Sequence, residues 1–173
     1  MAYQKPQEHA FLKIEKDIKA GSIPGVVLLC GKEAYLTDHY RERLIDEFVE
    51  PAAAAMDLTE IDREKVDPVD LVQMAETISL LSPRKVILIR DFIDERGKYP
   101  KAFEPGEIEP KAFFACLSQI PPESLVILTA SAPITTGDYK KKSDGRKLKK
   151  LGDEVKKAGG NLYDFGPLDP DPR

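Results

Sequence analysis

The chain has 173 residues, a length that suits one domain of ordinary size with a sizeable core. Its content of 42% hydrophobic and 32% charged residues excludes disordered and fibrous chains and indicates a soluble globular protein. The net charge of -4 is unevenly distributed, because residues 139–157 hold nine Lys and Arg against three Asp and Glu.

The first elements in chain order are a helix, a strand and a second helix. Apolar residues at helical spacing (Phe11, Ile14, Ile18) predict a helix within residues 1–20, and Gly21 favours its end. The five apolar residues 26–30 predict a buried strand. Leucine and aromatic residues at every fourth position of 36–48 then predict a helix that packs one face on a sheet, and Pro51 ends it.

A short strand is predicted over 58–62, followed by a helix that begins at Pro68 with Asp67 as its N-cap. The predicted buried face of this helix consists of Leu71, Met74, Ala75 and Ile78. The helix cannot continue through Pro83, because the residue before a proline is disfavoured in the helical conformation. We therefore expect a turn over residues 80–83.

The second half repeats the alternation of strands and helices. Residues 86–89 predict a strand buried on both faces, and the polar residues 93–109 predict a loop or insertion. A helix from Pro110, a strand at 125–128, a helix around residues 148–155 and a strand at 161–165 follow. This order predicts a three-layer α/β domain with a five-stranded, mainly parallel sheet over residues 1–167. Residues 168–173 are expected to begin a linker.

Little in the chain indicates catalysis or membrane attachment. The N-terminus has no apolar signal core and no run approaches the ~20 residues of a membrane helix, so we expect a cytoplasmic protein. The two cysteines, Cys30 and Cys116, are too few for a four-cysteine zinc site and are expected to pack as small hydrophobes.

A phosphate site is poorly supported. Nucleotide-binding α/β domains place Gly, Lys and a Ser or Thr in the loop after the first strand. Here Gly31 and Lys32 are followed by Glu33, which repels phosphate and has no hydroxyl for magnesium. A P-loop nucleotide-binding domain remains one alternative. A second alternative is a receiver-like phosphoacceptor domain, with Asp91 and Thr129 at suitable strand ends but without an acidic pair after the first strand.

Two leucines, Leu80 and Leu81, fall in the predicted turn. If they project into solvent, the expected reason is a partner with a pocket that receives them. The alternative is that they seal the domain's own core.

A basic segment precedes and enters the last predicted helix. It includes Lys140, Lys141, Lys142, Arg146 and Lys147. These side chains are candidates for contact with DNA or a neighbouring subunit. A solvated helix face is the competing interpretation, since only Tyr139 adds an aromatic ring.

Four stretches together resemble one known family. They are residues 25–36, with an apolar strand, glycine, acidic residue and Tyr-Leu; residues 80–91; residues 125–129; and residues 148–168. In order and spacing they resemble the N-terminal domain of the delta subunit of bacterial DNA polymerase III, a clamp loader subunit of the polymerase holoenzyme.

The resemblance implies an AAA+-like fold without a working Walker A loop, no catalysis, no ATP and no other cofactor. The implied partners are the beta sliding clamp, which delta helps to open for loading onto primed DNA, and the gamma/tau and delta prime subunits. DNA contact is expected to be indirect or weak. The family's clamp-binding Leu-Phe pair falls on Leu80 and Leu81, with Leu in place of Phe. The family continues into further helical domains, which we expect to follow the linker that begins at 168–173.

Overall fold

The computed structural model describes residues 8–103, 110–131 and 142–166. The α-helices are α1 (Ala10–Ala20), α2 (Ala34–Phe48), α3 (Ala54–Asp57), α4 (Pro68–Glu76), α5 (Pro110–Leu117) and α6 (Lys142–Lys157). The strands are β1 (Val26–Cys30), β2 (Leu58–Glu60), β3 (Lys85–Ile93), β4 (Ser124–Ala130) and β5 (Asn161–Asp164), with short 3-10 turns at Pro51–Ala53, Arg63–Lys65 and Lys101–Phe103. The predicted linker at 168–173 lies outside the described residues.

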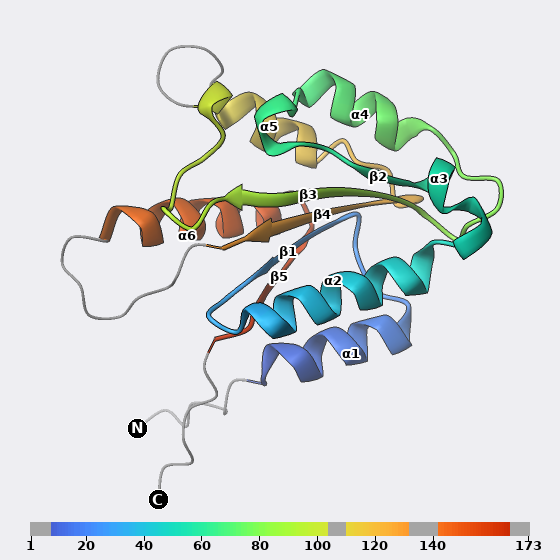
Figure 1. Cartoon of the computed structure of the whole chain (residues 1–173), viewed down its shortest axis with the longest axis horizontal. Helices are drawn as coiled ribbons and strands as arrows, with labels where there is room; N and C mark the ends of the chain where they lie inside the picture. The colour runs from blue at the N-terminus through green and yellow to red at the C-terminus, as the bar shows by residue number, and fades with distance from the viewer. Residues whose placement is uncertain (1–7, 104–109, 132–141, 167–173) are drawn as a thin grey trace, which may run out of the picture.

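The five strands form one parallel sheet in the order β2-β3-β4-β1-β5. Helices α1 and α2 cover one face, and α4, α5 and α6 cover the other (Figure 1). The predicted three-layer α/β architecture is confirmed. The expected strand at 26–30 has the observed bounds of β1.

The sheet separates two hydrophobic clusters. Along β1, Val26, Leu28 and Cys30 pack on the side of α4, α5 and α6, whereas Val27 and Leu29 pack on the side of α1 and α2. Successive strand residues point to opposite faces, so covering both faces requires an unbroken apolar run. This explains why the central strands show no apolar-polar alternation in the sequence.

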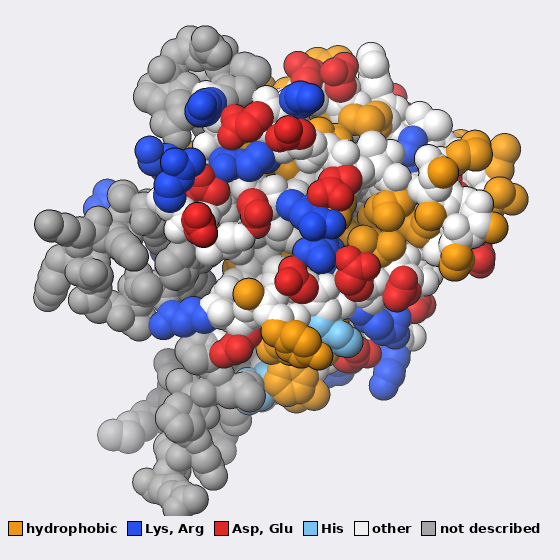
Figure 2. Space-filling model, viewed as in Figure 1, with side chains coloured by type: hydrophobic (Ala, Val, Ile, Leu, Met, Phe, Trp, Pro, Cys, Tyr) orange, Lys and Arg blue, Asp and Glu red, His pale blue; other side chains and the backbone are white. Residues whose placement is uncertain are grey.

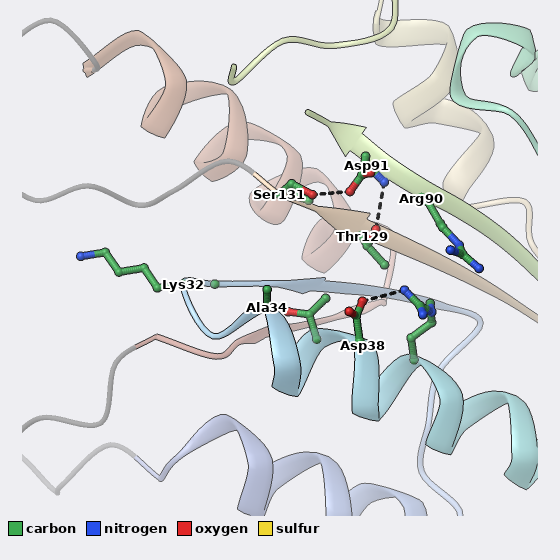
Figure 3. A pocket seen from close by; sticks show the side chains of 11 residues that line it. Lys32, Ala34, Asp38, Arg90, Asp91, Thr129 and Ser131 are labelled. Atoms are coloured by element: carbon green, nitrogen blue, oxygen red, sulfur yellow. Dashed lines mark hydrogen bonds and ion pairs between the residues drawn. The ribbon is translucent and has the colours of Figure 1, made fainter. Parts of the chain in front are cut away.

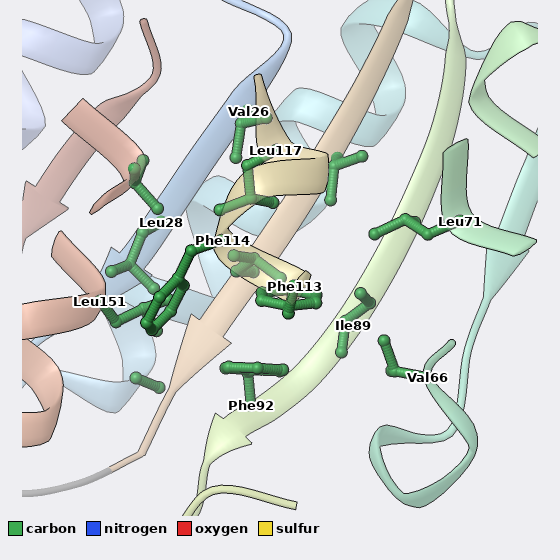
Figure 4. Close-up of a cluster of buried hydrophobic side chains, with 14 of the residues drawn as sticks. Val26, Leu28, Val66, Leu71, Ile89, Phe92, Phe113, Phe114, Leu117 and Leu151 are labelled. Atoms are coloured by element: carbon green, nitrogen blue, oxygen red, sulfur yellow. The ribbon is translucent and has the colours of Figure 1, made fainter. Parts of the chain in front are cut away.

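Residues 93–109 were predicted to be a polar loop or insertion; in the described part, 93–103, only Ile93 belongs to a strand and Lys101–Phe103 form a 3-10 turn, so the correction concerns the polar character of the segment. Strand β3 continues to Ile93, and the ring of Phe92 stacks on that of Phe113 at 4.4 Å between centroids (Figure 4). Phe103 is also buried, with its ring centroid 5.5 Å from that of Phe113. The turn residues Gly97 and Pro100 favoured the prediction of a polar loop, although the aromatic side chains of the segment pack in the hydrophobic core.

The helix before the leucine turn is shorter than predicted. Helix α4 ends at Glu76, and Thr77 adopts an extended conformation. Ile78 therefore leaves the helical period and is 72% exposed, which corrects its expected place on the buried face. The predicted cap is confirmed, since the Asp67 carboxylate accepts the backbone N–H groups of Val69 and Asp70 at 2.9 and 3.1 Å. Within the described ranges, no helix has both the length and the apolar character that a membrane crossing requires.

Candidate functional site

One candidate site is a cavity of about 650 Å³ at the carboxyl ends of β1, β3 and β4. Open parallel sheets bind ligands at such an edge, where neighbouring strands connect to opposite faces. Lys32, Asp38, Asp91, Thr129 and Ser131 are among the residues that line it (Figure 3).

The loop after β1 is closed against β5 and has little capacity for phosphate. The Glu33 N–H donates to the Phe165 carbonyl at 3.1 Å, and the Ala34 N–H donates to the Lys32 carbonyl at 3.1 Å. Gly31 has a φ of 124°, and a Cβ there would lie 2.4 Å from the Phe165 backbone. A phosphate cradle depends on free N–H groups in this loop, and these two are already bonded within the protein.

The charged groups of the cavity are mostly paired. Arg41 forms an ion pair with Asp38 at 2.8 Å, and Arg90 forms one with Glu60 at 2.9 Å. The Asp91 carboxylate accepts a hydrogen bond from the Ser131 hydroxyl, while the Asp91 N–H donates to Thr129 Oγ1 at 2.9 Å (Figure 3). The two residues of the receiver-like alternative are thus adjacent, but they bond to each other and to Ser131 within an irregularity of the β3–β4 pairing.

A second candidate site is an apolar surface at the turn after α4. Leu80 is 92% exposed and Leu81 is 67% exposed, and the nearby chain adds exposed Ile78. Met56 of α3 is also exposed, and its neighbour Asp57 bonds to Ser79 of the turn. Hydrophobic side chains gather at the end of the molecule where α3 lies (Figure 1 and Figure 2). Neither leucine belongs to either core cluster, so the alternative that they seal the domain's own core is wrong. Large exposed apolar side chains at neighbouring positions are typical of contact surfaces in general.

The leucine turn, residues 79–82, is held by a network centred on Asp57. The hydroxyls of Ser79 and Ser82 both donate to Asp57 Oδ2 at 2.7 Å. Ser79 Oγ accepts the N–H groups of Leu81 and Ser82 at 3.3 and 2.9 Å, and Ser82 Oγ accepts the Glu50 N–H at 3.0 Å. Each serine therefore joins the turn to a segment more than twenty residues earlier.

The bonds from Ser82 and Ser79 lower the pKa of the Asp57 carboxyl below its ordinary value of 3.8, so the group is charged near neutral pH. Sequence reasoning did not identify Asp57. Its partners lie 22 and 25 residues away, and no local spacing links them.

The turn is fixed to the sheet by Arg84, which lies directly before β3. The buried Arg84 guanidinium donates to the carbonyls of Ile23, Pro24 and Ser124 at 2.8–2.9 Å. Its carbon atom Cζ lies 4.9 Å from the centroid of the Phe48 ring. Burial lowers the pKa of Arg84 relative to an exposed arginine. These contacts fix the chain three residues after Leu81.

The predicted basic segment is only partly described. Lys140 and Lys141 lie outside the described residues, and Lys142 begins α6 without a described side chain. Arg146 is exposed. Lys147 is partly buried, with its Nζ 5.4 Å from the centroid of the Tyr99 ring and its carbonyl accepting the Tyr99 hydroxyl at 3.0 Å. Lys147 thus has a packing role, and its part in contact with DNA or a subunit stays a prediction.

Both cysteines are buried, as expected. Burial raises the pKa of the Cys116 thiol to about 12 and that of Cys30 still further, so neither is a reactive thiolate near neutral pH.

The fold and the two sites together define a class of protein: a parallel α/β domain whose loop after β1 is closed and whose turn before β3 displays exposed leucines. Residues 27–156 match the family described as DNA polymerase III, delta subunit, and the chain belongs to that family. The resemblance stated from the sequence is confirmed. A comparison with curated proteins gave no match.

Solved structures with a similar fold include two proteins of clamp loaders or of the DNA polymerase III gamma type. The Bacillus subtilis DNA clamp loader delta protein superposes with a TM-score of 0.63 at 23% sequence identity, covering 91% of this chain and 42% of that protein. A DNA polymerase III, gamma subunit-related protein from Thermotoga maritima gives a TM-score of 0.54 at 15% identity, covering 95% of this chain and 47% of that one. The chain therefore spans less than half the length of either protein.

Proposed function

We propose that this domain is the part of a replication clamp loader that binds the beta sliding clamp, and that Leu80 and Leu81 enter a hydrophobic pocket on the clamp. The observation that carries the proposal is the exposure of both side chains on a turn that the protein itself fixes in place. Membership of the delta family supports the choice of partner.

The size of this contact is adequate for a specific interaction. Burying an exposed leucine side chain contributes roughly 1.5–3 kcal/mol, so the pair contributes about 3–6 kcal/mol. That free energy corresponds to about two to four powers of ten in the dissociation constant. Since Leu81 is already one-third buried in the free domain, the lower part of this range applies.

Clamp opening follows from this contact if the domain binds the open ring more tightly than the closed ring, because a ligand shifts an equilibrium only by its difference in affinity for the two states. The proposed role is non-enzymatic and cytoplasmic. The proposed role requires no cofactor, and in the described residues the bonded N–H groups of the β1–α2 loop and the Arg41–Asp38 ion pair disfavour phosphate binding there. Further domains of the longer protein would join gamma/tau and delta prime, with DNA reached indirectly.

The test is a titration of the sliding clamp from the same organism with the wild-type chain and with the Leu80→Ala/Leu81→Ala variant. We expect the dissociation constant of the variant to rise at least about 100-fold. Its melting temperature should stay within a few degrees of wild type, because exposed side chains contribute little to folding.

The matched control is Leu12→Ala/Val69→Ala, which removes two other exposed apolar side chains. It should bind the clamp as the wild type does. Equal affinity of the leucine-turn variant and the control for the clamp would contradict the proposal, as would a large loss of stability in the leucine-turn variant alone.

A further inference from the structure

The two leucines do not fix their own position. Leu80 is almost fully exposed, and among the described residues the backbone of the two leucines makes one hydrogen bond, from the Leu81 N–H to Ser79 Oγ. The flanking serines make the remaining bonds of the turn, and both donate to a single atom, Asp57 Oδ2. Asp57 is itself buried at the end of α3.

We propose that Asp57 is a positioning residue for clamp binding: it holds the two serines and thereby fixes the leucine turn in the conformation that enters the clamp. This inference rests on the proposed function of the turn. A site held in its bound conformation before association loses less conformational entropy on binding and therefore binds more tightly.

The geometry gives Asp57 this role in preference to either serine alone. Each serine hydroxyl uses its one proton for Asp57 and its lone pairs for backbone N–H groups of the turn or of Glu50. A hydroxyl has one donor, so a serine that loses Asp57 must direct its proton elsewhere, and water or a carbonyl of the turn would compete for it. The hydrogen bonds to a charged carboxylate are also stronger than those between neutral groups.

Two substitutions of Asp57, one that keeps an acceptor oxygen and one that removes it, give a graded test. Because both serines donate to the same oxygen, the amide oxygen of an asparagine can accept both bonds, whereas alanine can accept none. Asp57→Ala should weaken clamp binding about tenfold or more, and Asp57→Asn should weaken it less than about threefold. Asp62→Ala is the matched control, since it removes an aspartate that accepts the Glu64 N–H in a different turn and should leave clamp affinity unchanged.

Two further measurements separate positioning from general support of the fold. Hydrogen exchange of the Leu81 and Ser82 amides should become faster in Asp57→Ala, while the amides of β1 and β4 keep their protection. When Leu80→Ala is already present, adding Asp57→Ala should cost less affinity than it does in the wild type, because the position of a missing side chain no longer matters.

The outcomes distinguish this inference from the proposed function. If the wild type does not bind the clamp, or if the leucine-turn variant binds as the wild type does, the proposed function fails. If the leucines matter but Asp57→Ala binds as tightly as wild type, only the positioning role is overturned. Loss of protection throughout the sheet in Asp57→Ala overturns it as well, since Asp57 would then support the whole fold.

Discussion

Two aspartates, Asp57 and Asp94, each order a turn by accepting several hydrogen bonds. Asp94 Oδ1 accepts the backbone N–H groups of Arg96 and Lys98 at 2.9 and 3.0 Å, and Asp94 Oδ2 accepts Arg63 and Arg96 side chains at 3.1 and 3.0 Å. Burial acts to raise the pKa of the Asp94 carboxyl, but these bonds outweigh it and hold the pKa well below the ordinary value of 3.8. The partners in such networks are not related by helical or strand spacing, so the sequence pattern does not predict them.

The Asp94 network predicts a pH dependence of stability. When the folded pKa is lowered, the unfolded chain takes up the proton first as pH falls, so the stabilisation is complete above about pH 5 and is lost towards the folded pKa. We expect the difference in unfolding free energy between wild type and Asp94→Asn to be largest near neutral pH and to shrink as pH falls from about 5 to about 2.

Urea denaturation at a series of pH values measures this difference. Asp38→Asn, which alters an ion pair whose carboxylate is exposed to solvent, is the control and should change the unfolding free energy by less than about 1 kcal/mol at every pH. A difference between wild type and Asp94→Asn that is constant or grows on acidification would show that the carboxylate charge does not stabilise the turn.

At the scale of elements, Arg84 joins the starts of three strands. It precedes β3 and donates to carbonyls just before β1 and at the first residue of β4. Replacing a buried charge with an apolar side chain is often harmless when its partner is also removed. Here the three partners are backbone carbonyls, which remain and lose their donor.

Arg84→Met should therefore lower the unfolding free energy by about 3 kcal/mol or more, since each unsatisfied buried group costs about 1–3 kcal/mol. Arg84→Lys should recover only part of this loss. Its ammonium group can donate to some of the carbonyls, but it cannot reach all three as the planar guanidinium does. Chemical denaturation is the measurement, with Arg90→Met, at a half-exposed ion pair, as the control. A loss in Arg84→Met no larger than in the control would contradict this account of Arg84.

The sequence was sufficient for elements that depend on local pattern. The unbroken run 26–30 predicted β1 with its observed bounds, and Asp67-Pro68 predicted the start of α4. The sequence was insufficient where tertiary contacts determine the end of an element or the burial of a side chain. Ile78 fits the apolar period of α4 but lies beyond its end, and Phe103 lies in a polar segment but packs on Phe113. The leucine pair was found from the sequence, whereas Asp57 required the fold.

For the molecule as a whole, the two ends of the sheet differ in character. At the carboxyl ends of the strands, the cavity where related folds bind nucleotides has paired charges and a closed loop. At the opposite ends, Arg84 and the Asp57 network hold the turn that displays Leu80 and Leu81 (Figure 1). A domain built in this way is suited to contact with a partner, and clamp binding at the turn is the central claim.

The most direct measurement of that claim is thiol modification at the turn itself. Since Cys30 and Cys116 are both buried, Leu80→Cys introduces the one readily modified thiol of the chain. Tyr35→Cys places a comparable thiol at a site that is 76% exposed, on α2. We expect saturating sliding clamp to slow modification at position 80 by about tenfold or more while leaving position 35 unchanged. Equal modification rates at position 80 with and without bound clamp would contradict the account.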